Sequence, residues 1–189
     1  GGQSIACRPA ARLDLAQPRG ASALARGAAG REGQFDRPRL PVDRSFSVAG
    51  FGTIVTGTLS DGRLAVGQEV EIVPAGLKAR VRGLQTHKRK LDAAAPGSRV
   101  AVNLSGVSKE QVSRGDVVCL PDTVRPTILV DVYLRMLRNA PHELRHNQPV
   151  DFFCGAAEVD SHTRLLDAEM LPPGASGWVQ LRLAKPVAV

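Results

Sequence analysis

Short segments with strand patterning recur along most of the chain and constrain its fold more than any other feature. From residue 40 onward, runs rich in β-branched and apolar residues alternate with turn signals about every 8–15 residues. Helical periodicity is weak throughout. The expected strand runs are 42–49, 53–59, 70–73, 78–85, 99–104 and 116–120, and then 127–137, 149–159, 162–170 and 176–189. This spacing predicts an all-β fold made of small barrels or sandwiches.

Residues 41–59, with the sequence PVDRSFSVAGFGTIVTGTL, read as two strands around a Gly-rich bend. In the first strand, one side of a period-two alternation holds Val42, Arg44, Phe46 and Val48, and the other holds Asp43, Ser45, Ser47 and Ala49. The adjacent charges Asp43–Arg44 stand at the start of this otherwise apolar hairpin. Their position requires an explanation, either as a contact between domains or as part of a binding site.

The chain divides at residues 121–126, PDTVRP, where two prolines and polar residues separate apolar runs. We therefore expect two small β-barrels in series, at 37–121 and 122–189. The second is expected to be truncated, because the chain stops directly after an apolar strand. Residues 1–36 are rich in Ala, Gly and Arg and have no sustained apolar stripe, so we expect a poorly ordered tail or the remnant of another domain. The first residue is not Met, which favours an internal fragment.

Charge and cysteine content narrow the class of protein. The net charge is +7, with +4 in residues 1–40, +4 in 41–121 and −1 in 122–189. A basic middle segment favours a polyanionic partner such as nucleic acid, although an Arg-rich composition from a GC-rich genome would also raise the charge. No run reaches the roughly 20 apolar residues of a membrane helix, and the N-terminus lacks the pattern of a signal peptide. Cys7, Cys119 and Cys154 are widely spaced, which favours reduced thiols and a cytoplasmic location.

The segment His142-Glu143-Leu144-Arg145-His146 matches the H-E-x-x-H signature of zinc hydrolases. That chemistry needs both His side chains on one helical face, with the Glu as base. Pro141 and Pro149 bracket the motif and leave at most two helical turns, so we expect a loop or a strand end here. Glu158 or His162 could supply a third ligand. A small zinc hydrolase is therefore kept as a remote alternative.

Two other short motifs have both structural and functional interpretations. The basic run of His87, Lys88, Arg89 and Lys90 is either a solvated hairpin tip or a set of nucleic-acid phosphate contacts. Arg114-Gly115-Asp116 resembles an integrin-binding tripeptide, but a tight turn before a strand explains it. No G-x-x-x-x-G-K-[ST] loop occurs, so the sequence contains no phosphate-binding loop of that kind.

Three longer segments together resemble the second domain of translational GTPases of the elongation factor Tu class. They are the hairpin 41–59, then GRLAVGQEVEIVPAG, then PGSRVAVNLSGVSKEQVSRGDVV. In that family a Pro-x-acid-x-x-Phe strand leads into a G-x-G-T-x-V-x-G hairpin, and a later G-x-x-V-x-V/L-x-L-x-G strand precedes an R-G-D/Q turn. Within the family the chain most resembles selenocysteine-specific elongation factors. Arg44 replaces the second acidic residue of the general pattern, and Arg99 replaces its Asn. Residues 127–187 resemble the third domain of those factors.

This resemblance implies a pocket for the aminoacyl end of tRNA, formed by Asp43, Arg44, Phe46, Thr56 and Arg99. A selenol is far more acidic than a thiol, so selenocysteine is an anion at neutral pH, and two guanidinium groups would favour it over serine or cysteine. Asp43 would either hold an arginine or accept a hydrogen bond from the amino group of the aminoacyl ester. A purely structural role for Asp43–Arg44 at a domain face is the alternative.

The resemblance also implies partners and cofactors. We expect selenocysteyl-tRNA and the ribosome as partners of a monomer that does not bind membranes. The messenger RNA hairpin that directs selenocysteine insertion would be read by C-terminal domains missing from this chain. GTP and Mg would bind only the missing GTPase domain, so this fragment is expected to have no cofactor, no metal and no enzyme activity. The alternative within the family is a fragment that binds ordinary aminoacyl-tRNA.

Overall fold

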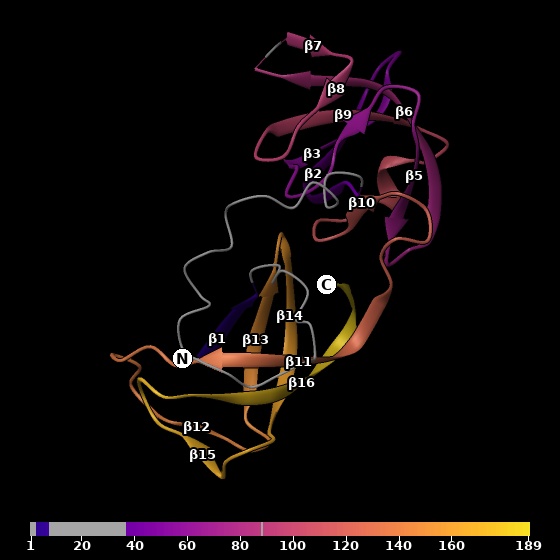
Figure 1. The fold of residues 1–189 in the computed structure, drawn as a ribbon. Coiled ribbons are helices and arrows are strands. Elements are labelled where there is room, and N and C mark those ends of the chain that lie inside the picture. The colour runs from indigo at the N-terminus through magenta and orange to yellow at the C-terminus, as the bar shows by residue number, and fades with distance from the viewer. Residues whose placement is uncertain (1–2, 8–36, 88) are drawn as a thin grey trace.

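The computed structural model describes residues 3–7, 37–87 and 89–189, and these residues are almost entirely strand (Figure 1). Two β units follow one another along the chain, which confirms the predicted all-β class. The one helical element in the described ranges is the 3-10 turn η2, and none of their helices has the length and apolar character to cross a lipid bilayer. The first unit contains β2 (Arg39–Val48), β3 (Gly52–Thr58), β4 (Leu64–Ala65), β5 (Glu69–Val73), β6 (Leu77–Thr86), β7 (Arg89–Leu91), β8 (Ala93–Ala94), β9 (Arg99–Ser105), η2 (Lys109–Gln111) and β10 (Val117–Cys119).

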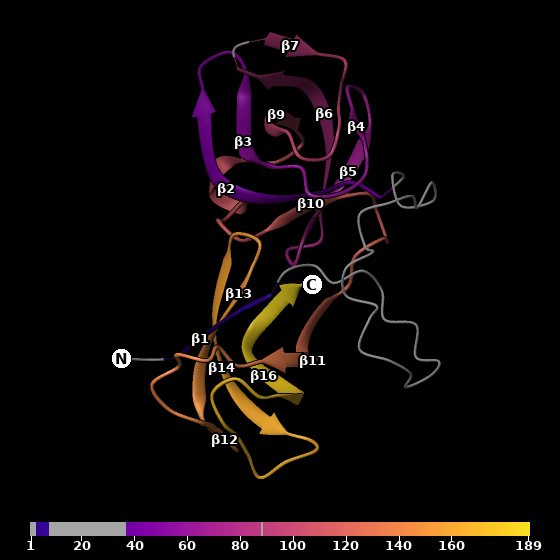
Figure 2. The ribbon, with the colours of Figure 1, turned by 60° about the vertical axis from the view of Figure 1, so that its left-hand side comes forward.

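Six strands of the first unit close into a barrel. Their order is β5-β10-β2-β3-β9-β6, and β6 pairs again with β5, while β7 extends the sheet from β6. Figure 2 shows these strands as a ring. Closure removes unpaired strand edges and encloses one apolar core. The fully buried side chains of that core include Leu40, Leu59, Leu64, Ile72 and Leu104.

The second unit is a five-stranded sheet in the order β1-β13-β14-β16-β11, with its own core around Phe152 and Leu181. The strands are β1 (Gln3–Cys7), β11 (Pro126–Arg135), β12 (Leu144–Arg145), β13 (Pro149–Cys154), β14 (Ala157–Leu165), β15 (Met170–Leu171) and β16 (Ser176–Ala188). A separate ribbon joins β12 to β15. The predicted linker ends one residue earlier than expected, because Pro126 already begins β11.

Strand β1 was not expected from the sequence. It pairs in parallel with β13, so residues near the N-terminus complete one edge of the second sheet. The rest of the predicted tail, residues 1–2 and 8–36, lies outside the described residues.

The alternation predicted for the first strand of the hairpin is wrong beyond Val42. Val42 is fully buried, whereas Phe46 and Val48 are 38% and 36% exposed on the other face. The register of β2 against β3 shifts between Val42 and Arg44, which is a β-bulge. One additional residue reverses the side on which every later side chain lies, so Phe46 and Val48 occupy the outer face of the barrel.

The two units meet at a small apolar cluster and a hydrogen bond. Val73, Val117 and Cys119 of the barrel pack with Val124 and Ala188. The Arg39 Nη2 atom donates to the backbone oxygen of Val189 at 2.5 Å. Burial raises the pKa of the Cys119 thiol, which is consistent with an unreactive, reduced cysteine in this cluster.

Candidate functional site

The bulge in β2 places two successive charged residues at the outer surface of the barrel. Val42 pairs with Gly57 and Arg44 pairs with Thr56, so Asp43 is the additional residue between them. A Cβ atom on Gly57 would lie 2.1 Å from the carbonyl oxygen of Pro41. The close passage of β2 across β3 therefore requires glycine here, and this accounts for the last glycine of the G-x-G-T-x-V-x-G pattern.

Asp43 holds one of the two predicted arginines. The Nη1 atom of Arg99 donates to Oδ2 of Asp43 at 2.5 Å, and the two side chains are 57% and 35% exposed. Arg99 is the first residue of β9, which reaches the bulge because β9 pairs with β3 in the closed barrel. The ion pair realises one of the two roles expected for Asp43, that of holding an arginine.

The second arginine, Arg44, lies on the same outer face of the barrel as Arg99. Arg44 pairs with Thr56, and Thr56 pairs with Ala101. Arg99 precedes Ala101 by two residues on β9, and side chains two residues apart share a face. From a strand spacing of about 4.8 Å and a rise of about 3.4 Å, the Cα atoms of the arginines are roughly 12 Å apart. Within residues 37–87 and 89–189, Arg44 forms no ion pair.

Thr56 and Phe46 complete the predicted set, and both also belong to the outer face. The hydroxyl of Thr56 is buried and has no hydrogen-bond partner in the described structure. Phe46 pairs with Ile54, which pairs with Asn103. All five predicted pocket residues are therefore brought to one face of β2, β3 and β9. Whether that face binds an aminoacyl group remains a prediction.

A groove that the sequence did not reveal continues from this face. It has a volume of about 490 Å³ and lies between the β2–β3 turn, β9 and the β6–β7 hairpin. Its apolar lining includes Phe51 and Ile54. The side-chain oxygen of Asn103 is buried at its wall without a partner in the described residues. Buried acceptors without partners are rare, so this atom favours a ligand with a hydrogen-bond donor. A polar residue within the apolar run VAVNL was the available sequence signal.

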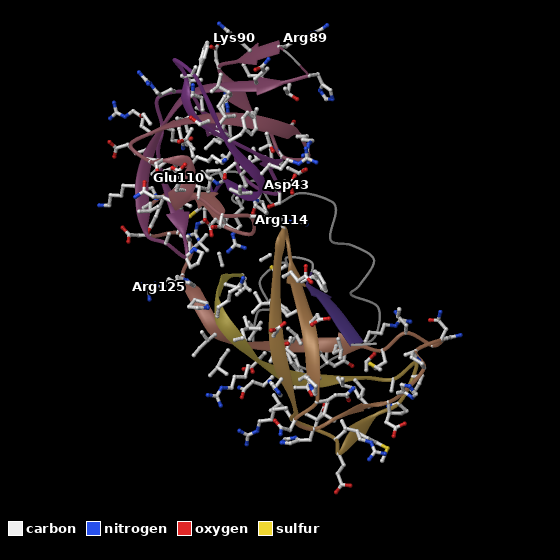
Figure 3. The ribbon with its side chains drawn as sticks, turned by 180° about the vertical axis from the view of Figure 1, so that it is seen from behind. Asp43, Arg89, Lys90, Glu110, Arg114 and Arg125 are labelled. Atoms are coloured by element: carbon white, nitrogen blue, oxygen red, sulfur yellow. The ribbon has the colours of Figure 1, made fainter. Side chains whose placement is uncertain are left out.

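The predicted basic run forms the end of the β6–β7 hairpin, and this hairpin contacts the backbone of Arg99 through Thr86. Figure 3 shows Arg89 and Lys90 at the end of the barrel remote from the second unit. The Thr86 hydroxyl donates to the carbonyl of Arg99 at 2.8 Å and contacts Nδ1 of His87 at 3.1 Å. Lys90 also lines the groove. Thr86 thus links this hairpin to the strand that carries Arg99, while Lys88 lies outside the described residues.

The H-E-x-x-H segment does not have the geometry of a zinc site. Leu144–Arg145 form strand β12, as the flanking prolines predicted, so His142 and His146 do not share a helical turn. Glu143 instead accepts two hydrogen bonds from Arg145, at 2.7 and 3.1 Å, and these lower the pKa of Glu143. The described part of the chain contains no group of three or more metal-ligating side chains, and so none that unites this motif with Glu158 or His162.

The Arg114-Gly115-Asp116 motif is a turn, as predicted. It connects η2 to β10, and Asp116 Oδ2 accepts a hydrogen bond from the backbone N–H of Ser113 at 2.8 Å. Asp116 is only 9% exposed. Burial raises the pKa of the Asp116 carboxyl, and the Ser113 N–H and the nearby Lys185 act in the opposite direction.

The closed six-stranded barrel, with the predicted residues on its outer face, corresponds to a known family of domains. Residues 52–119 match the family described as elongation factor Tu domain 2. This part of the chain therefore belongs to the elongation factor Tu-like family, as its motifs indicated.

Individual relatives refine this assignment. The chain is 41% identical over 149 residues, 79% of its length, to the selenocysteine-specific elongation factor of Desulfomicrobium baculatum. It is 42% identical over 103 residues, 54% of its length, to elongation factor 1-alpha of Pyrobaculum aerophilum. The chain spans only 24% and 23% of these two relatives, about a quarter of their length.

Proposed function

We propose that this chain is the part of a translation elongation factor that holds the aminoacyl end of selenocysteyl-tRNA during its delivery to the ribosome. The observation that carries the proposal is the placement of Arg44 and Arg99 on one outer face, with Asp43 bound to Arg99. The similarity to a selenocysteine-specific elongation factor supports the same cargo.

The charges of this face suit an anionic side chain. Arg44, Arg99 and Asp43 together carry a net charge of +1, because Asp43 neutralises one guanidinium. A selenolate would bring the face to neutrality. A seryl side chain would leave Arg44 without a counter-ion as water is displaced, and an unpaired charge in such a site is unfavourable. Selectivity would therefore come chiefly from the rejection of neutral side chains.

The groove suits the nucleotide to which the amino acid is esterified. It begins at Ile54 and Ala101, beside Thr56, and extends to Lys90 and Arg82. An apolar floor can stack a base, the free oxygen of Asn103 can accept from an exocyclic amine, and the cations can contact phosphates. The order of pocket, groove and basic hairpin therefore follows the order of amino acid, terminal nucleotide and phosphate backbone.

The remaining properties of the whole protein are also proposals. GTP and Mg would be bound by a GTPase domain joined to this chain, which itself would act as a binding module and not as an enzyme. A monomer in the cytoplasm that contacts tRNA and the ribosome is the simplest form consistent with delivery. The mRNA hairpin for selenocysteine insertion would be contacted by other domains.

Ordinary aminoacyl-tRNA is the second candidate cargo, and the similarity to elongation factor 1-alpha favours it. The two candidates are separated by equilibrium binding of selenocysteyl-tRNA and seryl-tRNA on the same tRNA body, with a GTPase domain joined ahead of this chain. The proposal predicts at least a tenfold preference, about 1.4 kcal/mol, for the selenocysteyl form. Equal affinities would favour the ordinary cargo.

A further inference from the structure

The bulge that carries Asp43 and Arg44 is anchored on both sides by the loop before β10. On one side, Val42 donates to the carbonyl of Asp116 at 2.8 Å and accepts from the N–H of Gly115 at 3.0 Å. On the other side, the Ser45 hydroxyl donates to the carbonyl of Val112 at 2.8 Å. The loop 112–116 therefore fixes the path of β2 where the regular ladder to β3 is interrupted.

The second unit contacts this same region through the tip of the β13–β14 hairpin. Gly155 lies so close to Pro41 that an added Cβ would be 2.9 Å from the ring atoms Cβ and Cγ. Gly115 lies against Ala157, where an added Cβ would be 2.9 Å from the Cα atom. Figure 3 shows Arg114 at the tip of this hairpin and Asp43 just beyond it, and Figure 1 shows the same hairpin directed at the barrel.

We infer that the tip of the β13–β14 hairpin is a positioning element for the Asp43–Arg99 ion pair, with Gly155 and Ala157 as its positioning residues. Pro41, which Gly155 touches, is two residues before Asp43. Gly115, which Ala157 touches, is hydrogen-bonded to the residue immediately before Asp43. The hairpin thus supports both the strand and the loop that hold the bulge in place.

Close packing makes this support effective. Contacts of this kind leave no space for an additional methyl group, so a change at the tip must move either Pro41 or the loop 112–116. A bulge locally disrupts the ladder of hydrogen bonds to its neighbouring strand, so we expect such a movement to displace Asp43. The consequence for cargo selection rests on the proposed function, whereas the positioning of the ion pair is a property of the chain alone.

The inference is tested by NMR on the 189-residue chain. The observable is the exchange rate of the Arg99 side-chain N–H protons, which an ion pair slows. Asp43→Asn calibrates the signal for the broken pair, where exchange should rise about two-fold for an exposed pair. Gly155→Ala should produce a comparable rise. Gly174→Ala is the matched control, because Gly174 also has a positive φ, of 83°, and an added Cβ there would lie 3.4 Å from Arg138 of its own unit.

A second variant keeps the test informative if Gly155→Ala does not fold. Ala157→Gly loosens the other contact of the hairpin tip without adding an atom, and it should raise the exchange rate in the same direction. The inference is overturned if Gly155→Ala and Ala157→Gly both leave Arg99 exchanging at the wild-type rate while Asp43→Asn accelerates it. If exchange rises in both variants but cargo preference in the joined protein does not change, the positioning stands and the proposed function fails.

Discussion

The guanidinium of Arg99 donates to the carboxylate of Asp43 at 2.5 Å and joins two residues that lie 56 positions apart in the chain. Asp43 is the extra residue of a β-bulge, and Arg99 is the first residue of a strand two positions away in the barrel. The pairing of β3 with both β2 and β9 therefore brings the two charges together. Both groups remain partly exposed, which is typical of a binding surface and not of a buried structural pair.

Removal of this ion pair should have little effect on folding. Because both side chains are partly solvated, Arg99→Ala should lower the free energy of unfolding by only about 0.2–1 kcal/mol. Urea denaturation of the wild-type and variant chains measures the difference. A loss of several kcal/mol would show that the pair is a structural support and would weaken its assignment to a cargo pocket.

Asn103→Leu should raise the stability of the chain and weaken its binding of RNA. The side-chain oxygen of Asn103 is buried without a partner in the described residues, so its replacement should raise the free energy of unfolding by about 1 kcal/mol. The same change removes the acceptor at the wall of the groove and should weaken binding of an aminoacyl-tRNA. Thermal denaturation and equilibrium RNA binding on one sample test both parts. An unchanged RNA affinity would remove the groove from the proposed site.

Much of the strand pattern could be predicted from local sequence. The runs 53–59 and 99–104 were expected as strands and form β3 and β9, because β-branched alternation and flanking glycines act over a few residues. The side on which Phe46 lies could not be predicted in this way. It depends on the bulge at Asp43, and the bulge is held by hydrogen bonds from Val42 to a loop about 70 residues later.

The candidate site was predictable only in part. The family resemblance implied an anion pocket at Asp43, Arg44 and Arg99, but only the folded sheet shows which arginine the carboxylate holds. The groove beside Asn103 depends on side chains from the β2–β3 hairpin, the β6–β7 hairpin and β9, and it has no compact sequence motif. The contact of Gly155 with Pro41 was also hidden, since a glycine in a turn usually indicates only backbone conformation.

The buried carboxyl of Asp116 should make stability depend on pH. Because burial raises its pKa in the folded chain, ionisation is penalised more in the folded state than in the unfolded state. Its contribution to stability is full below about pH 3.8, the ordinary value, and is lost as the pH rises through the folded pKa. The side chain of Asp116→Asn cannot ionise. The free energy of unfolding of this variant, relative to that of the wild type, should therefore increase as the pH rises through the folded pKa of Asp116. Urea denaturation at a series of pH values tests this, and parallel curves would contradict it.

The basic hairpin should contribute to RNA affinity through phosphate contacts. If Lys90 neutralises one phosphate, Lys90→Ala should reduce the slope of log affinity against log salt by about 0.7–0.9. Lys109→Ala, on the exposed η2 turn, is the matched control and should leave the slope unchanged. Filter binding at several salt concentrations measures the slopes. Equal slopes for both variants and the wild type would show that the hairpin is a solvated tip that makes no phosphate contact.

The most direct test of the account is the cargo preference of the Arg44→Ala/Arg99→Ala double variant, with a GTPase domain joined ahead of the chain. The ratio of the dissociation constants for seryl-tRNA and selenocysteyl-tRNA is measured for this variant and for the unsubstituted protein. If the two guanidinium groups select the selenolate, the ratio should fall close to one, mainly through tighter binding of seryl-tRNA, because no unpaired guanidinium then disfavours the neutral side chain. A ratio that stays at its original value in the double variant would contradict the account.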